Sequence, residues 1–154
     1  MLGELLWTVL SEGDETVVAV SGLWDRLGES WASQNEYDKA GRAFAQALSL
    51  LRALPQSEEF LIALRGKADC EWKLDRRKEG LELAREQLEV ARAMNDGNIP
   101  TGHYLADALE FAARFARMDG NQAEAVRLAS EAQKLRESIE TAPVTNSVPA
   151  PTAQ

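Results

Sequence analysis

The chain has 154 residues, of which 45% are hydrophobic and 27% are charged, the usual composition of one globular domain. Its single cysteine and single histidine exclude a disulfide scaffold and every metal site that needs two imidazoles or several thiolates. A net charge of -8, from 25 acidic and 17 basic residues, argues against binding to nucleic acid or to an anionic membrane.

The predicted elements are helices throughout, and they follow an apolar N-terminal segment, 1–14. This segment has no basic start and is too short to cross a membrane, so neither a signal peptide nor a membrane anchor is expected. A short extra helix near 3–10 is one interpretation of it. From residue 15 onward, apolar residues recur every three or four positions, which is typical of helices that bury one face. The predicted helices span 15–34, 37–54, 58–73, 76–95, 102–118 and 122–140.

Helix boundaries are predicted from side chains that accept a hydrogen bond from the first backbone N–H groups of a helix. The predicted N-caps are Asn35, Ser57, Asp75 and Asn121. Pro55, the segment 96–102 and the Asp119–Gly120 turn are predicted breaks. Because the connections are short, consecutive helices are expected to pack as antiparallel neighbours. Residues 141–154 have no charge, no aromatic residue and three prolines, so a disordered tail is expected there.

Three segments of the chain align without a gap, and each holds a polar turn followed by a helix. They start at Ser33, Lys73 and Met118, which are 40 and then 45 residues apart. Small or aromatic residues recur at matching places in and before these segments: Gly28, Ala40 and Phe44, then Ala68, Gly80 and Ala84, then Ala113, Ala125 and Ala129. This is the pattern of a repeated helical hairpin, whose units bury their apolar faces only by stacking.

The first hairpin carries a more specific pattern. It consists, in chain order, of a tryptophan, a Leu-Gly pair, a second aromatic residue, an alanine, a phenylalanine and a second alanine. These positions are Trp24, Leu27, Gly28, Trp31, Ala40, Phe44 and Ala47. In order and spacing this resembles the tetratricopeptide repeat (TPR) family, and the long intervals are similar to the longer-helix variety of kinesin light chains and many bacterial signalling proteins. The resemblance implies a TPR-like domain over 15–140, a right-handed α-solenoid of three antiparallel helical hairpins. The implied repeats span about 15–54, 58–95 and 102–140.

The residues that carry the resemblance are expected to have packing roles. Gly28 and Ala40 are expected to be small because two helix backbones approach closely, whereas Trp24, Trp31 and Phe44 are expected to fill the space between hairpins. The predicted repeat core comprises Trp24, Leu27, Gly28, Trp31, Ala40, Phe44, Ala47, Ala68, Gly80, Ala84, Ala113, Ala125 and Ala129.

Little in the sequence points to catalysis or to a bound metal. Cys70 lies within a predicted helix with no histidine at catalytic spacing, so we interpret it as a structural thiol. His103, Asp107 and Glu110 share one helical face, but three ligands along one straight helix do not easily converge on an ion. We therefore expect no enzymatic activity, no cofactor and no metal site.

A stacked array of hairpins presents a concave groove that is lined mainly by the first helix of each repeat. The predicted groove residues are Asp25, Glu29, Arg65, Asp69, Trp72, Glu110, Arg114 and Arg117. The groove is thus expected to be acidic at its start and basic, with an aromatic residue, at its end. Trp72 has two interpretations, an exposed anchor for a partner or a side chain packed on a neighbouring helix. TPR domains of chaperone cofactors clamp a terminal carboxylate with Lys and Asn, and Asp25 and Glu29 at the equivalent positions disfavour such a ligand.

These features predict a cytoplasmic scaffold that binds a segment of a partner protein or peptide in its groove, and neither nucleic acid nor a membrane. One alternative is a self-associating structural or regulatory module of a larger assembly, including a homodimer formed through the N-terminal helix. Another is a small secretion-type chaperone, a class that also holds three TPRs at this size and acidity.

Overall fold

The computed structural model describes the backbone of residues 2–143 and the side chains of residues 13–143. It contains six helices and, within this part of the chain, no β-strand. The helices are α1 (Leu2–Ser33), α2 (Tyr37–Leu51), α3 (Glu58–Lys73), α4 (Arg77–Met94), α5 (Ile99–Met118) and α6 (Gln122–Glu140). The prediction of an all-helical protein is therefore confirmed. The part of the predicted tail beyond residue 143 lies outside the described residues.

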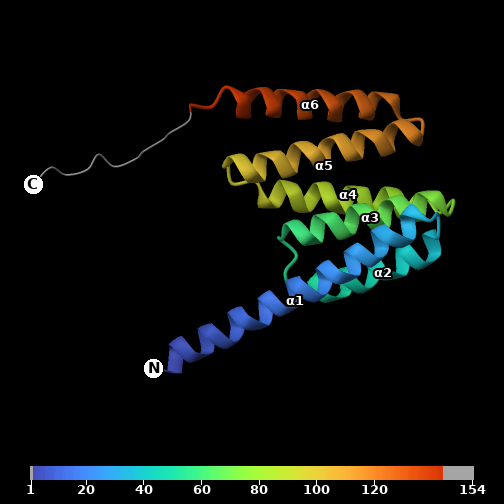
Figure 1. Ribbon diagram of the computed structural model, residues 1–154. Helices are drawn as coiled ribbons and strands as arrows, with labels where there is room; N and C mark the ends of the chain where they lie inside the picture. Colours follow the sequence, from blue (N-terminus) through green and yellow to red (C-terminus); the bar gives the residue numbers. More distant parts are fainter. Residues whose placement is uncertain (1, 144–154) are drawn as a thin grey trace, which may run out of the picture.

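The helices stack in the order of the chain. Each helix packs against the next one, and α1 also contacts α3. Figure 1 shows α1 and α2 at one end of the stack and α6 at the other end, with the N-terminal half of α1 extending past α2. Within the described residues, none of the helices is long and apolar enough to cross a membrane.

The first helix is longer than predicted. The sequence suggested a short helix near 3–10 and a separate helix from residue 15, but α1 runs without a break from Leu2 to Ser33. The polar stretch between the two predicted helices contains no proline, and the one glycine in it, Gly13, lowers helix propensity without ending the helix. Helix α2 is shorter than predicted, because it ends at Leu51 and not at residue 54.

Two of the predicted N-caps are correct, and a third cap was missed. Ser57 Oγ accepts a hydrogen bond from the Phe60 backbone N–H at 3.2 Å, and Asn121 Oδ1 accepts one from the Glu124 N–H at 3.2 Å. The missed cap is Asn98, whose Oδ1 accepts from the Thr101 N–H at 3.0 Å. As a result α5 begins at Ile99, before the predicted start at residue 102.

Asn35 and Asp75 are not N-caps, and the prediction for these two residues is wrong. Both have left-handed backbones, with φ of 61° and 62°. Each lies in the turn that reverses the chain, and the next helix is preceded by Glu36 or Arg76 instead. Asn and Asp adopt a left-handed conformation more readily than other residues with side chains, so the same residue types fit either position.

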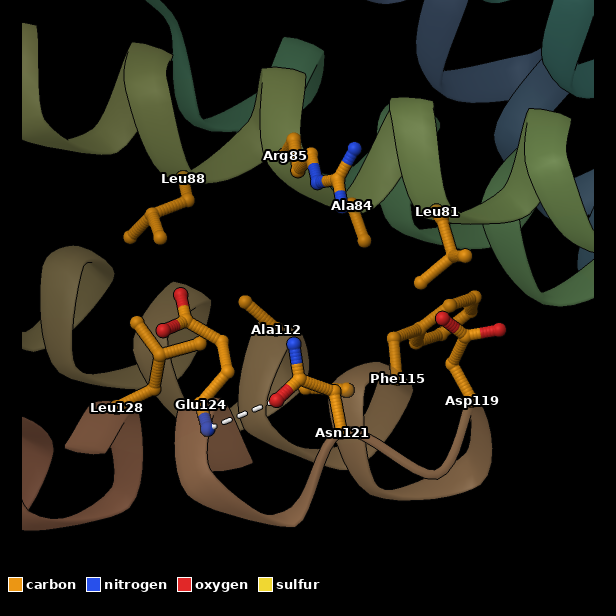
Figure 2. A pocket seen from close by; sticks show the side chains of 11 residues that line it. Leu81, Ala84, Arg85, Leu88, Ala112, Phe115, Asp119, Asn121, Glu124 and Leu128 are labelled. Carbon is orange, nitrogen blue, oxygen red and sulfur yellow. Dashed lines mark hydrogen bonds between the residues drawn. The ribbon is translucent and has the colours of Figure 1, made fainter. Parts of the chain in front are cut away.

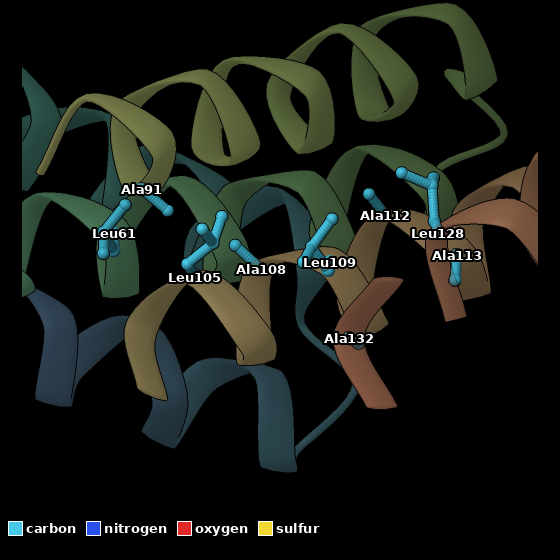
Figure 3. Close-up of a cluster of buried hydrophobic side chains, with 9 residues drawn as sticks. All are labelled: Leu61, Ala91, Leu105, Ala108, Leu109, Ala112, Ala113, Leu128 and Ala132. Carbon is cyan, nitrogen blue, oxygen red and sulfur yellow. The ribbon is translucent and has the colours of Figure 1, made fainter. Parts of the chain in front are cut away.

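The buried core joins helices that are neighbours in the stack. Figure 3 shows its largest part, in which leucines from α3, α5 and α6 meet small residues of α4, α5 and α6. These buried side chains are Leu61, Ala91, Leu105, Ala108, Leu109, Ala112, Ala113, Leu128 and Ala132. The alanines allow the helices to approach closely, and the leucines fill the remaining space.

The aromatic ring of Phe44 explains two of the glycines in the first three helices, Gly28 and Gly66. A Cβ atom on Gly28 of α1 would lie 2.8 Å from Phe44 Cζ, and a Cβ on Gly66 of α3 would meet the same ring. Gly28 is therefore small because it contacts an aromatic side chain, and not because of a crossing of two backbones as expected. Close backbone approach does apply at Gly80, where a Cβ would lie 3.2 Å from the carbonyl oxygen of Ala68.

The predicted repeat core is buried unevenly. The buried members are Gly28, Ala40, Phe44, Ala47, Ala68, Gly80, Ala84, Ala113 and Ala125. Trp24, Trp31 and Ala129 are only half-buried. Leu27 is 40% exposed and does not belong to the buried core.

Candidate functional site

A pocket of about 440 Å³ lies where α1, α2, α3 and α5 meet, and we call it the α1–α3–α5 pocket. It is lined by Glu29, Ala32, Tyr37, Phe44, Ile62, Arg65, Gly66, Asp69, Cys70, Lys73 and Arg114. Its volume falls in the range typical of ligand sites, and its lining combines apolar side chains with a few charged ones.

Helix α3 contributes one continuous face to this pocket. Ile62, Arg65, Asp69 and Lys73 follow one another at intervals of three or four residues, so they share one side of the helix. Lys73 is not among the predicted groove residues, although its place four residues after Asp69 puts it on the predicted face. Gly66 lies on the same side and leaves room for the Phe44 ring.

The arginines of the pocket are held against aromatic rings of α5. The Arg65 guanidinium lies 5.0 Å from the centroid of Phe111, and that of Arg114 lies 4.9 Å from the same centroid. Arg114 Nη2 also contacts Asp69 Oδ1 at 2.7 Å. This ion pair is about half exposed, so it orients the two side chains more than it stabilises the fold. The guanidinium groups thus have defined positions before any ligand binds.

Asp25 lies beyond the acidic end of the pocket and is buried, which corrects its prediction as an exposed groove residue. It is 6% exposed, and its Oδ1 has no hydrogen-bond partner among the described residues. Burial, followed by the charges of Glu29 and Glu59, raises the pKa of Asp25 from its ordinary value of 3.8 to about 7. Glu29, one turn further along α1, reaches the pocket itself.

The other predicted groove residues lie elsewhere. Trp72 is half-buried and packs edge-on against Phe115, with ring centroids 5.3 Å apart, so it matches the packing interpretation. Glu110 Oε1 accepts a hydrogen bond from Arg136 Nε of α6 at 2.7 Å. Arg117 is exposed near the end of α5 and does not line the pocket. Of the eight predicted residues, the pocket therefore collects Glu29, Arg65, Asp69 and Arg114.

The face that carries His103 is occupied by an ion-pair network. Arg136 Nη2 lies 2.6 Å from Asp107 Oδ1, and the same guanidinium binds Glu110. The hydrogen bond from Arg136 holds the pKa of Glu110 below its usual range. Among the residues with described side chains, no group of three or more His, Cys, Asp or Glu side chains is arranged to hold a metal ion.

Two further titratable groups are buried in α3. Burial, together with the nearby Asp69, raises the pKa of Cys70 to about 11, so the thiolate is scarce at neutral pH. Burial also acts to raise the pKa of Glu71, but hydrogen bonds and charge from Lys67 and Arg76 lower it overall. Lys67 Nζ lies 2.9 Å from Glu71 Oε1. We therefore interpret the buried Cys70 thiol and the buried, ion-paired Glu71 carboxylate as structural groups.

A second pocket, between α4, α5 and α6, is smaller, at about 150 Å³ (Figure 2). Its walls are mostly apolar, with Leu81 and Leu88 on one side and Leu128 on the other. The dashed line in Figure 2 is the cap hydrogen bond between Asn121 and the Glu124 backbone, so the polar atoms at its edge already serve the start of α6. This space is too small for a peptide segment.

No protein-family model matches this chain, and no curated protein matches it. The TPR resemblance of the first hairpin therefore remains a prediction.

Proposed function

We propose that this protein is a non-enzymatic interaction module that binds a segment of a partner protein in the α1–α3–α5 pocket. In this proposal the chain is a right-handed α-solenoid of three TPR-like hairpins, α1–α2, α3–α4 and α5–α6. The observation that carries it is the meeting of Glu29, Arg65, Asp69 and Arg114, which come from three odd-numbered helices and line one pocket. In a TPR-like array the first helices of the hairpins line the concave side. The unpaired, buried Cys70 is in keeping with a cytoplasmic location.

The charges of the pocket define the kind of segment it suits. Arg65 and Lys73 offer positive charge on α3, and Arg114 is already paired with Asp69. Glu29 offers negative charge at the α1 side, near the buried Asp25. A segment with an acidic residue toward Arg65 and Lys73, and a basic residue toward Glu29, complements this distribution.

The apolar lining gives such a segment an anchor between its two charges. Tyr37, Phe44 and Ile62 line the pocket, and Ile62 is 42% exposed. An apolar side chain of the partner therefore buries its surface against these three residues. Because the arginines are already positioned by Phe111, the receptor loses little conformational entropy when the segment binds.

Selection from random peptides displayed on phage tests this function even though the partner is unidentified. We expect the selected peptides to share an apolar residue flanked by an acidic and a basic one. Binding of a selected peptide is then measured by fluorescence anisotropy for the wild type, for Arg65→Glu and for Glu29→Lys. Each charge reversal is expected to weaken binding by about tenfold or more, and added salt should reduce the difference.

Arg117→Glu is the matched control, because Arg117 is a predicted groove residue on the same helix as Arg114 but lies outside the pocket. We expect its peptide affinity to equal that of the wild type. The proposal is wrong if no peptide is enriched, or if Arg117→Glu weakens binding as much as Arg65→Glu does.

A further inference from the structure

A small pocket of about 110 Å³ adjoins the α1–α3–α5 pocket, nearer the N-terminal ends of α3 and α5, and we call it the Gln87 pocket. Ile62 and Arg65 line both pockets, so the two are neighbouring parts of one groove between α3 and α5. The Gln87 pocket is too small for a peptide segment, but it admits the end of one side chain. Its polar lining residues are Glu58, Arg65, Gln87, Tyr104 and Asp107.

The side-chain amide of Gln87 is buried, and its oxygen is unpaired. Gln87 is 5% exposed, and its Nε2 donates a hydrogen bond to the Leu61 carbonyl oxygen at 3.0 Å. This bond fixes the orientation of the amide, because the reverse placement would set Oε1 against the carbonyl oxygen. Oε1 has no hydrogen-bond partner among the described residues. A buried acceptor without a donor costs free energy, which a donor that enters the pocket recovers.

Two carboxylates line the same pocket, one from α3 and one from α5. Glu58 Oε2 accepts a hydrogen bond from the Tyr104 hydroxyl at 2.9 Å. Asp107 Oδ1 accepts one from Arg136 Nη2 at 2.6 Å. Each of these bonds engages one oxygen, whereas a carboxylate accepts about four hydrogen bonds through its two oxygens. Both carboxylates therefore keep free acceptor capacity, and the Tyr104 hydroxyl already donates its proton.

Arg65 is the positively charged residue of the lining, and it lies at the boundary with the α1–α3–α5 pocket. Its guanidinium lies 5.0 Å from the centroid of the Phe111 ring, and its charge helps to lower the pKa of Glu110. Both of these α5 residues come after Asp107 in the chain, and neither lines the Gln87 pocket. The rest of the polar lining thus offers hydrogen-bond acceptors and negative charge, which together suit a cationic donor.

We infer that the Gln87 pocket binds the ammonium group of a lysine side chain from the partner segment. The three N–H donors of an ammonium group match three acceptor groups, which are Gln87 Oε1 and the carboxylates of Glu58 and Asp107. An ammonium group is a compact charge, whereas a guanidinium is planar and larger, so the small volume favours lysine over arginine. The inference rests on the proposed function, because it states where the bound segment continues beyond Arg65.

Peptides selected on the wild-type protein test the inference. We expect them to carry a lysine in addition to the basic residue that faces Glu29. Replacing this lysine with methionine, which is similar in length and uncharged, should weaken binding to the wild type by about tenfold or more in fluorescence anisotropy. For Asp107→Asn, the difference between the lysine and methionine peptides should be at least about threefold smaller. Glu110→Gln is the matched control, because Glu110 also binds Arg136 but does not line the pocket, and it should keep the full difference.

Nuclear magnetic resonance tests the role of Gln87 without replacing it. The side-chain carbonyl carbon of Gln87 should change its chemical shift when the lysine peptide binds, and much less when the methionine peptide binds, because only the lysine donates to Oε1. The same carbon of Gln46, which is exposed and outside the pocket, should not respond.

The outcomes separate this inference from the proposed function. If no peptide is enriched, the proposed function is wrong and the inference falls with it. The inference alone is overturned if the enriched peptides lack the lysine or bind equally well with methionine in its place. It is also overturned if Asp107→Asn and Glu110→Gln behave alike, or if the Gln87 signal does not distinguish the two peptides.

Discussion

Replacing Asp25 with asparagine removes a buried carboxyl group whose ionisation the fold opposes. Asp25 is 6% exposed, and Glu29 on α1 and Glu59 on α3 are the charged groups that act on it. Burial, followed by these two charges, raises its pKa from 3.8 to about 7. A raised pKa means that the folded state keeps the proton over a pH range in which the unfolded chain has lost it.

The sign and size of the effect on stability follow from the difference between the ordinary pKa of Asp25, 3.8, and its pKa of about 7 in the folded protein. The contribution of Asp25 to the free energy of unfolding is fully present below pH 3.8, falls as the pH rises, and levels off above about pH 7. At about 1.4 kcal/mol per pH unit, the whole interval corresponds to at most about 4 kcal/mol. Between about pH 5 and pH 8, where ordinary carboxyl groups are already ionised, we expect a loss of about 2–3 kcal/mol.

Urea unfolding monitored by circular dichroism measures this loss. Experiments at about pH 5, 6, 7 and 8 use one protein concentration, because self-association would also change the apparent stability. The free energy of unfolding should fall with pH in the wild type and stay nearly constant in Asp25→Asn. Asp14→Asn, which removes an exposed carboxyl group of the same helix, should retain the wild-type slope. An equal slope in Asp25→Asn and the wild type would refute the reasoning.

Three further predictions concern the packing of α3. Gly66→Ala should lower the free energy of unfolding by about 1–3 kcal/mol in urea titrations, because the added Cβ meets the ring of Phe44. Lys67→Met should lower it by a similar amount at neutral pH, about 1–3 kcal/mol, because the buried Glu71 loses one of its two cationic partners. The Cys70 thiol should react with iodoacetamide far more slowly in the native protein than in urea, as mass spectrometry at pH 8 can measure, because it is buried and its pKa is raised to about 11.

The two substitutions have matched controls in the same chain. Gly22→Ala places a Cβ where no atom lies within 4 Å, so it should not destabilise and is expected to add up to about 1 kcal/mol through helix propensity. Lys78→Met removes a lysine whose side chain is 85% exposed and should change stability little. Destabilisation by Gly22→Ala equal to that by Gly66→Ala, or rapid native alkylation of Cys70, would contradict the packing described.

The sequence predicted the helices well because apolar spacing reports directly on which face a helix buries. It predicted the turns less well, because Asn35 and Asp75 are residue types that serve both as N-caps and in left-handed turns. Local sequence does not distinguish these two uses when the turn is only a few residues long. Asn98 was missed because Pro100 suggested a break, although proline is tolerated in the first turn of a helix.

The candidate site was predicted in part, since a helical face is visible in the sequence but its neighbours are not. Arg65, Asp69 and Arg114, which the sequence assigned to one groove, lie on the faces of α3 and α5 that meet in one pocket. Asp25 was expected to be exposed, yet the contact between α1 and α3 buries it. Trp72 packs against Phe115, which lies more than 40 residues later in the chain. No local sequence pattern reveals this contact, so the sequence could not decide whether Trp72 is exposed.

The ring of Phe44 between Gly28 and Gly66 has a consequence for how this architecture is able to change over evolutionary time. Duplication or exchange of single hairpins is the ordinary route by which arrays of helices lengthen. In this chain, exchange of the segment α1–α2 without α3 would separate the Phe44 ring from Gly66, one of the two glycines that leave room for it. The first three helices are therefore expected to be inherited as a block, and any lengthening of the array should begin after α3.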